Sequence, residues 1–250
     1  MTDDHRTDSA GVPWEGRSFQ PNPHAGDSGE TPPEVSEALG AWRSGAGTYS
    51  GLIAAFAANR FLIPLVAHAG DDFDSDNPVM EDKVQELSVV TVAGPNGEKV
   101  IPVFTSAAAM KTWNAEARPI PSDAQRVALA AASEHTDRIV VNPGTDSIVL
   151  RRPVVWSIAQ GTDYRAPWES PEFVADTRDL LGDIANLNEI GVASGDPGST
   201  GSGSDVTLVL SVAAGLAPEV VRAVIYSVQA RVSASDLFTS RVDALTLTRT

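Results

Sequence analysis

The stretch that decides the fold begins with PVFTS at residues 102–106 and ends with IVVNP at residues 139–143. Each run is apolar and then polar, a pattern typical of a buried strand followed by a helix cap or a turn. Between the two runs, small residues ending at Trp113 predict a short helix, and residues 127–131 predict the apolar face of a second helix. Strands that alternate with helices in this way predict an α/β (α+β-like) fold with a mixed sheet.

The segments on both sides continue the same alternation. Thr31 and Thr48 stand where caps of two helices are expected, and the apolar run at residues 61–66 predicts a buried strand. We further expect strands at residues 87–92, 99–104, 138–141 and 147–151, a hairpin turn at Asn96-Gly97, a type II turn at Asn142-Pro143-Gly144, a capping box at Ser122-Asp123-Ala124-Gln125, and a closing helix between Pro153 and Gly161. Together these elements predict a main domain over residues 31–161.

Three segments lie outside the main domain. Residues 1–30 are rich in Pro, Gly, Ser and Asp, which predicts a disordered acidic tail. Residues 162–204 have the composition of an acidic, Gly/Ser-rich linker with one short candidate helix. Residues 205–250 predict a small β-α-β unit that is too small to be stable alone. We therefore expect this C-terminal unit to pack on the main domain or on a partner.

Residues 36–160, about half of the chain, resemble the N-terminal domain of the bacterial SseB (enhanced serine sensitivity) family. The order and spacing of several features carry the resemblance: the helix leading into FLIPL at residues 61–65, the Asn96-Gly97 hairpin, PVFTS, Trp113 and IVVNP. The resemblance implies an α/β fold and a cytoplasmic protein with an effect on sensitivity to serine. It implies no catalytic or cofactor-binding residues.

Charge and cysteine content narrow the classes of partner. The formal net charge is −15, and residues 162–205 alone hold nine acids and two bases. Such a chain is repelled by phosphate backbones and anionic lipid surfaces, which argues against nucleic-acid and membrane binding. The chain contains no cysteine, which excludes disulfides and thiolate metal sites. The first residues lack the pattern of a secretory signal, so we expect a cytoplasmic protein.

The candidate binding residues are Phe104, Thr105, Ser106, Trp113 and Asn142. Hydroxyl groups beside a strand end can meet a ligand, and an aromatic ring can stack on one. The same residue types are also needed for a buried strand end, a helix cap and a turn, and this packing interpretation is favoured.

Other patterns resemble sites but depart from them in decisive positions. The run Gly45-Ala46-Gly47 follows a helix instead of a strand, which favours an interhelical turn over a dinucleotide loop. Residues 72–83 lack the glycine and the final glutamate of a calcium loop. His68 and His135 are isolated, and Arg151-Arg152 is expected on a solvated face. We therefore predict no catalytic residue, no metal site and no cofactor.

These observations predict a non-catalytic, cytoplasmic regulatory or protein-interaction module with an as yet unidentified protein partner. The alternative is a small-molecule sensor or enzyme, related to amino acids as the family name suggests. A pocket with convergent polar side chains would favour the alternative, whereas an exposed apolar patch would favour the interaction module.

Overall fold

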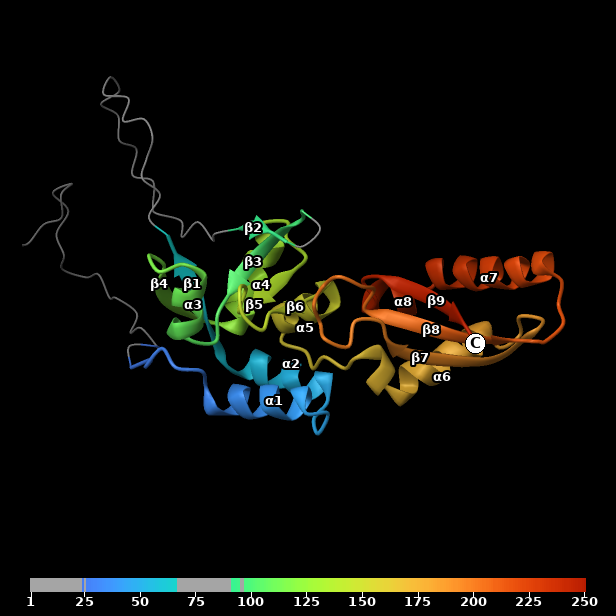
Figure 1. Cartoon of the computed structure of the whole chain (residues 1–250), viewed down its shortest axis with the longest axis horizontal. Coiled ribbons are helices and arrows are strands. Elements are labelled where there is room, and N and C mark those ends of the chain that lie inside the picture. The colour runs from blue at the N-terminus through green and yellow to red at the C-terminus, as the bar shows by residue number, and fades with distance from the viewer. Residues whose placement is uncertain (1–23, 25, 67–90, 95–96) are drawn as a thin grey trace, which may run out of the picture.

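The computed structural model describes residues 24, 26–66, 91–94 and 97–250 (Figure 1). The elements of the first part are α1 (Pro33–Arg43), α2 (Tyr49–Ala58), β1 (Arg60–Leu65), β2 (Val92–Ala93), β3 (Lys99–Val103), α3 (Ala107–Trp113), β4 (Arg118–Asp123), α4 (Ala124–Ser133), β5 (Ile139–Val141), β6 (Ile148–Leu150) and α5 (Arg152–Gln160). Those of the second part are the 3-10 helix η1 (Pro167–Glu169), α6 (Pro171–Leu181), β7 (Leu187–Ser194), β8 (Val206–Val212), α7 (Pro218–Ser233), α8 (Asp236–Arg241) and β9 (Leu245–Arg249). The two parts lie end to end along the long axis of the molecule.

The first part is built on a four-stranded sheet of order β2-β3-β5-β6. Strands β3 and β5 are parallel, whereas β2 pairs with β3 and β6 pairs with β5 in the antiparallel sense. Strands β1 and β4 form a separate antiparallel ribbon, which a bridge between Leu62 and Phe104 joins to the end of β3. The predicted α/β fold with a mixed sheet is confirmed.

Both faces of this sheet are covered. On one face, strand residues such as Ile101 and Ile139 pack with the helices α1, α2, α4 and α5 in the largest core cluster. On the other face, Val100, Val140 and Val149 form a smaller buried cluster. Burial on both sides explains why β5 and β6 are continuous apolar runs instead of alternating ones.

The second part is a three-stranded sheet of order β7-β8-β9, in which β7 is antiparallel and β9 parallel to β8. Helices α6, α7 and α8 share one core with Val206, Leu208 and Leu210 of β8. The alternate residues of β8 and β9, such as Val209 and Thr246, are half-buried or exposed on the other face. The β8-α7-β9 order confirms the predicted C-terminal β-α-β unit.

The segment that was expected to be a linker is folded. Its predicted short helix is present as α6, but residues 187–194 form β7, which is the partner of β8. Residues 195–204 are held against the first part, since the N–H of Val149 donates to the carbonyl of Ser199 at 2.7 Å. The prediction of a linker is wrong here because composition reports flexibility but not the tertiary contacts that remove it. The domain boundary at residue 161 stays a prediction.

Local expectations for the first part were met except at three places. The expected cap at Thr31 is wrong, because the N-cap of α1 is Pro32 and no side chain caps this helix. Thr48 and Ser106 cap α2 and α3, Gly144 has a φ of 82° in the expected turn, and Gly161 ends α5 in the left-handed region. The capping box at residues 122–125 is wrong, because Ser122 belongs to β4 and the Asp123 side chain makes no cap hydrogen bond. The expected tail boundary at residue 30 is also wrong, because described residues before it make defined contacts with the core. The acidic loop at residues 71–86 and the first part of the expected strand at 87–92 lie outside the described residues.

Candidate functional site

The five sequence-predicted site residues meet at one edge of the four-stranded sheet. Phe104, Thr105 and Ser106 follow β3, and Asn142 follows β5. Because β3 and β5 are parallel, their carboxyl ends lie at the same edge, which is where α/β folds place ligands. Trp113 reaches the same edge from the end of α3, with its ring centroid 5.4 Å from that of Phe104.

The Asn142 side chain forms hydrogen bonds with both the backbone and the side chain of Thr105. The Asn142 Oδ1 accepts from the Thr105 N–H at 2.9 Å, and its Nδ2 donates to the Thr105 Oγ1 at 3.0 Å. Asn142 has a φ of 51°, a left-handed conformation that asparagine tolerates better than most residues. The amide is therefore used to connect the ends of β3 and β5.

The remaining three residues pack and cap. Phe104 is fully buried, and Ser106 accepts the N–H of Ala109 at 3.1 Å as the N-cap of α3. Trp113 is half-buried and packs against the cluster that contains Phe104. These contacts agree with the packing interpretation, and a ligand at these five residues stays a prediction.

Residues 26–31, here called the N-terminal strap, lie over this same edge. The Arg60 guanidinium donates to both carboxylate oxygens of Asp27 and, at 2.7 Å, to the carbonyl oxygen of Thr105. The Thr31 hydroxyl is 3.1 Å from the Thr105 hydroxyl, and the Gly29 carbonyl accepts the N–H of Ala107 at 2.7 Å. The Arg60 hydrogen bonds hold the pKa of Asp27 below its ordinary value. The sequence alone contained no indication that Arg60 makes these contacts.

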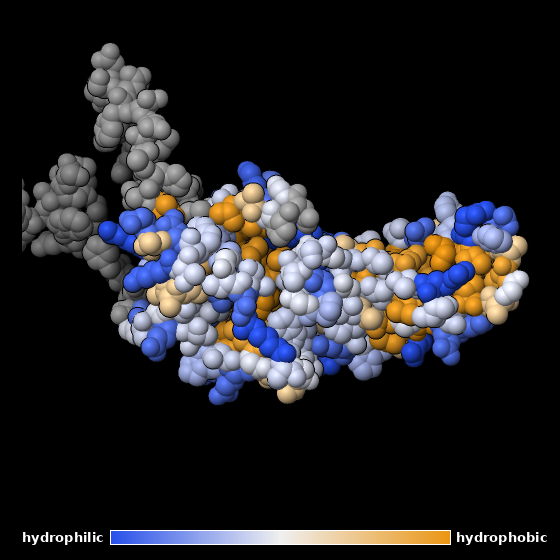
Figure 2. Space-filling view, viewed as in Figure 1, coloured by the Kyte–Doolittle hydropathy of each residue, from blue (hydrophilic) through white to orange (hydrophobic). Residues whose placement is uncertain are grey.

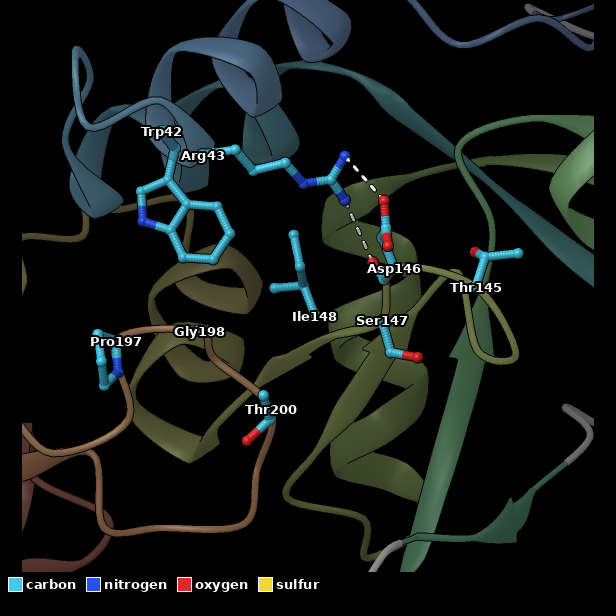
Figure 3. Close-up of a pocket in the computed structure, with 9 residues that line it drawn as sticks. All are labelled: Trp42, Arg43, Thr145, Asp146, Ser147, Ile148, Pro197, Gly198 and Thr200. Carbon is cyan, nitrogen blue, oxygen red and sulfur yellow. Dashed lines mark hydrogen bonds and ion pairs between the residues drawn. The ribbon is translucent and has the colours of Figure 1, made fainter.

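A surface cleft of about 690 Å³ lies between the end of α1, the β5–β6 turn and residues 197–200 (Figure 3). Arg43 and Asp146 face each other across its rim at 3.3 Å, with exposed side chains. Trp42 and the buried Ile148 supply its apolar lining. None of the five predicted site residues lines this cleft.

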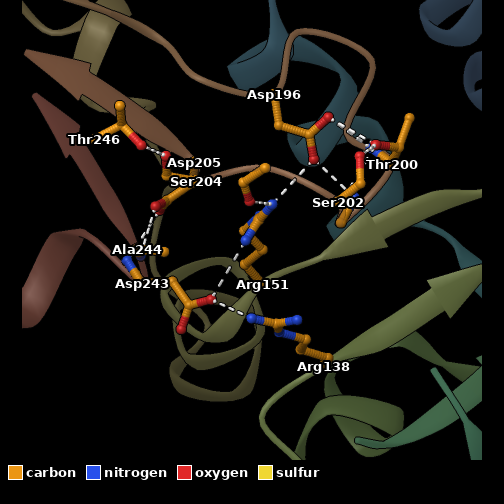
Figure 4. A network of polar contacts seen from close by, with 12 residues as sticks. Arg138, Arg151, Asp196, Thr200, Ser202, Ser204, Asp205, Asp243, Ala244 and Thr246 are labelled. Atoms are coloured by element: carbon orange, nitrogen blue, oxygen red, sulfur yellow. Dashed lines mark hydrogen bonds and ion pairs between the residues drawn. The ribbon is translucent and has the colours of Figure 1, made fainter. Parts of the chain in front are cut away.

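A buried ionic network joins the two parts of the chain (Figure 4). Arg151 is only 4 % exposed and donates to Asp196 at 3.0 Å and to the carbonyl of Gly203. Asp243 lies 3.0 Å from Arg138 and 3.6 Å from Arg151. The expectation that Arg151 lies on a solvated face is wrong, because its partners come from a segment more than 40 residues away that the sequence did not connect to it.

The carboxylates of this network differ in their surroundings. Burial alone would raise the pKa of Asp196, but the amides of Thr200 and Gly201 and the Arg151 guanidinium lower it below its ordinary value. Burial raises the pKa of Asp205, although its carboxylate accepts the N–H groups of Asp243 and Ala244. The polar groups of this network bind one another, and together they connect the first part of the chain to the second. The network is here called the joint.

An apolar surface is present on the second part, between α7 and β9 (Figure 2). Ile225 of α7 and Leu245 and Leu247 of β9 pack on the core but are only partly buried; they are here called the α7–β9 surface. Arg231 of α7 pairs with Asp183 and donates to the carbonyl of Leu180, so α6 meets α7 near Arg231. Among the described strands, β9 pairs with β8 alone, and its outer edge has no strand partner.

The described residues contain neither a cluster of metal ligands nor a helix that could span a membrane. Within residues 24, 26–66, 91–94 and 97–250, no three His, Asp or Glu side chains are grouped as metal ligands would be. No helix in the described part of the chain has the length and apolar character needed to cross a membrane. His135 is exposed at the end of α4, while His68 and the calcium-like residues 72–83 lie outside the described residues. The Gly45-Ala46-Gly47 run is the turn between α1 and α2.

Comparison with known proteins covers the first part only. Residues 35–157, from α1 into α5, match the family model described as SseB protein N-terminal domain. No curated protein and no solved structure matches the chain. The match includes both strands that carry PVFTS and IVVNP, and it ends before the three-stranded sheet. The resemblance expected from the sequence is thus confirmed over residues 35–157, which are similar to the SseB protein N-terminal domain.

Proposed function

We propose that this protein is a non-catalytic, cytoplasmic interaction module that binds an extended segment of another protein along β9. The observation that carries the proposal is the combination of an unpaired strand edge with the adjoining apolar α7–β9 surface. An exposed strand edge offers a row of backbone donors and acceptors, to which a partner strand can add.

The sequence of β9, Leu-Thr-Leu-Thr-Arg, suits such an addition. Leu245 and Leu247 lie on the helix side of the sheet, in register with the core residues Val206 and Leu208. Thr246 and Thr248 lie on the opposite, exposed face. A partner strand would gain backbone hydrogen bonds from the edge and apolar contact from the leucine side, and specificity would come from its alternate side chains.

The polar residues of the other candidate sites support the same proposal. The polar side chains of Thr105, Asn142 and Arg151 form hydrogen bonds with other residues of this chain. In contrast, the α7–β9 surface holds side chains whose contact with the core is incomplete. Apolar surface of this kind gains most from a partner, and the contact it makes depends little on salt.

A matched pair of variants tests the proposal. Leu247→Asp places a charge on the apolar side of β9, and Thr248→Asp places the same charge on the exposed face of the same strand. With each protein immobilised in native cytosol at low and high salt, we expect wild type and Thr248→Asp to retain a protein partner that Leu247→Asp loses. Melting curves of both variants establish that they are folded. Equal retention by a folded Leu247→Asp variant would contradict the proposal.

A second candidate function rests on the cleft of Figure 3. The exposed Arg43 and Asp146 face each other beside the apolar Trp42 and Ile148, an arrangement that suits the carboxylate and ammonium groups of a small amino acid. A panel of amino acids tested by thermal shift would reveal such a sensor. The shift should disappear in Arg43→Gln, and the α7–β9 variants should leave it unchanged.

A further inference from the structure

The seat of the N-terminal strap is a built site for a carboxylate. The Arg60 side chain is 8 % exposed, and its guanidinium grips both oxygens of Asp27. A guanidinium bound in this two-pronged way selects planar carboxylates by geometry as well as by charge. In the described part of the chain, Asp27 is the carboxylate that Arg60 binds.

The seat is positioned by the folded core. Arg60 begins β1 and is placed by the ribbon with β4, where it pairs with Asp123 in register. The carbonyl of Thr105, which accepts from Arg60, is held through Asn142 at the carboxyl ends of the parallel strands β3 and β5. These contacts do not involve the strap, so the core itself positions the backbone of Arg60 and the carbonyl of Thr105.

The strap itself is attached by polar contacts alone. Its sequence, Gly-Asp-Ser-Gly-Glu-Thr, contains no apolar side chain. The side chains of the strap therefore gain no stabilisation from the burial of an apolar residue, which is the main favourable term in packing. Hydrogen bonds and one ion pair hold it, and a segment with the same groups can replace them one for one.

We propose that the strap seat is a binding site for an acidic segment of a partner protein, with Arg60 as its carboxylate-binding residue and Asp27 as a competitor within the same chain. The fitting segment places an aspartate two residues before a glycine, as the strap does, because the Gly29 N–H also donates to the Asp27 carboxylate. Since a tethered competitor acts at a high effective concentration, a free segment binds well only when the strap is weakened or removed. This site is independent of the α7–β9 surface.

A labelled peptide with the sequence of residues 26–33 is the probe. Asp27→Asn removes the carboxylate that Arg60 binds, and Glu30→Gln removes the same charge from an exposed side chain. Glu30 meets Arg60 through its backbone carbonyl, which this substitution leaves in place. By fluorescence anisotropy we expect the peptide to bind Asp27→Asn about tenfold more tightly than wild type or Glu30→Gln. Arg60→Lys in the Asp27→Asn background should abolish the gain, because lysine lacks the two-pronged geometry. Equal affinity for wild type and Asp27→Asn overturns the proposal.

A second measurement uses the otherwise unchanged strap. The chain has no cysteine, so Ser28→Cys provides a single labelling position on an exposed residue. Added peptide should displace the strap and increase the rotational mobility of the label. A peptide with Asn in place of its aspartate should be at least tenfold weaker. If saturating peptide leaves the label's mobility unchanged, the strap and the peptide do not share a seat and the proposal fails.

Discussion

The two sheets of this protein differ in how completely they are covered. The four-stranded sheet buries both faces, because Val140 and Val149 on its second face are covered as well as the main core. In the described part of the chain, the helices of the three-stranded sheet pack on one of its faces, and Thr246 and Thr248 of β9 are exposed on the other. The difference agrees with the proposed function: the first sheet is buried on both faces, whereas the second leaves an edge and a face open to contact.

The covering of the first sheet comes partly from the second part of the chain. Gly201 has a φ of 80°, and a Cβ at this position would lie 2.9 Å from the Val149 Cγ2. Asp196 organises the same loop by accepting the N–H groups of Thr200 and Gly201, and it also pairs with Arg151. The loop between β7 and β8 is thus part of the scaffold, which gives ways to test the comparison.

The largest effect is expected where the scaffold is most completely buried. Phe104→Ala removes a ring that is 0 % exposed and should lower the free energy of unfolding by about 3–5 kcal/mol. Leu247→Ala truncates a partly exposed side chain and should lower the free energy of unfolding clearly less than Phe104→Ala does. Urea denaturation of both variants makes the measurement. If the two costs are equal, the end of β3 at Phe104 is no better covered than β9.

The next effect concerns the joint between the parts. Asp196→Asn keeps the shape of the buried side chain but removes the negative charge that pairs with Arg151. We expect the free energy of unfolding to fall by about 1–3 kcal/mol. Asp146→Asn is the matched control, because its ion pair with Arg43 is exposed and should contribute about 0–1 kcal/mol. Chemical denaturation compares the two. A control that costs as much as Asp196→Asn would show that the buried network does not hold the joint.

A smaller effect isolates the contact of the loop with the first sheet. Gly201 and Gly215 have φ values of 80° and 74°, so alanine at either position costs about 1–2 kcal/mol for the left-handed backbone. Only Gly201 is close to another side chain, since a Cβ at Gly215 would meet open space. Gly201→Ala should therefore lower the melting temperature more than Gly215→Ala. Equal shifts would mean that the loop moves away from Val149 without cost.

The smallest effect is a pH dependence at the strap. The hydrogen bond from Arg60, with help from the Gly29 N–H and the nearby His24, lowers the pKa of Asp27 in the folded protein. A carboxyl whose folded pKa is lowered contributes stability above its unfolded pKa, and this contribution disappears as the pH falls through the folded pKa. The stability difference between wild type and Asp27→Asn should thus be greatest near neutral pH and vanish in acid. A stability difference that stays constant with pH would show that the Asp27–Arg60 ion pair does not stabilise the strap.

The candidate site was predicted only in part. Thr105 and Asn142 were recognised because a polar residue after an apolar run stands out in a sequence, and the parallel pairing of β3 and β5 explains why they meet. The tertiary contacts of Arg60 and Arg151 were missed. A single arginine next to an apolar run has no distinguishing pattern, and its role depends on a partner 33 or 45 residues away.

The sequence by itself determined the local elements and the family of the first part. Apolar runs, caps such as Thr48 and Ser106, and the glycines at Gly144 and Gly161 act over a few residues, so their meaning can be read without the fold. Only the tertiary structure decided that residues 195–204 are docked, that the strap covers the strand ends, and that β9 is an edge. Each of these features depends on contacts between segments that are distant in the sequence. Composition predicts how flexible a segment is by itself, but not which surface of the protein will hold it in place.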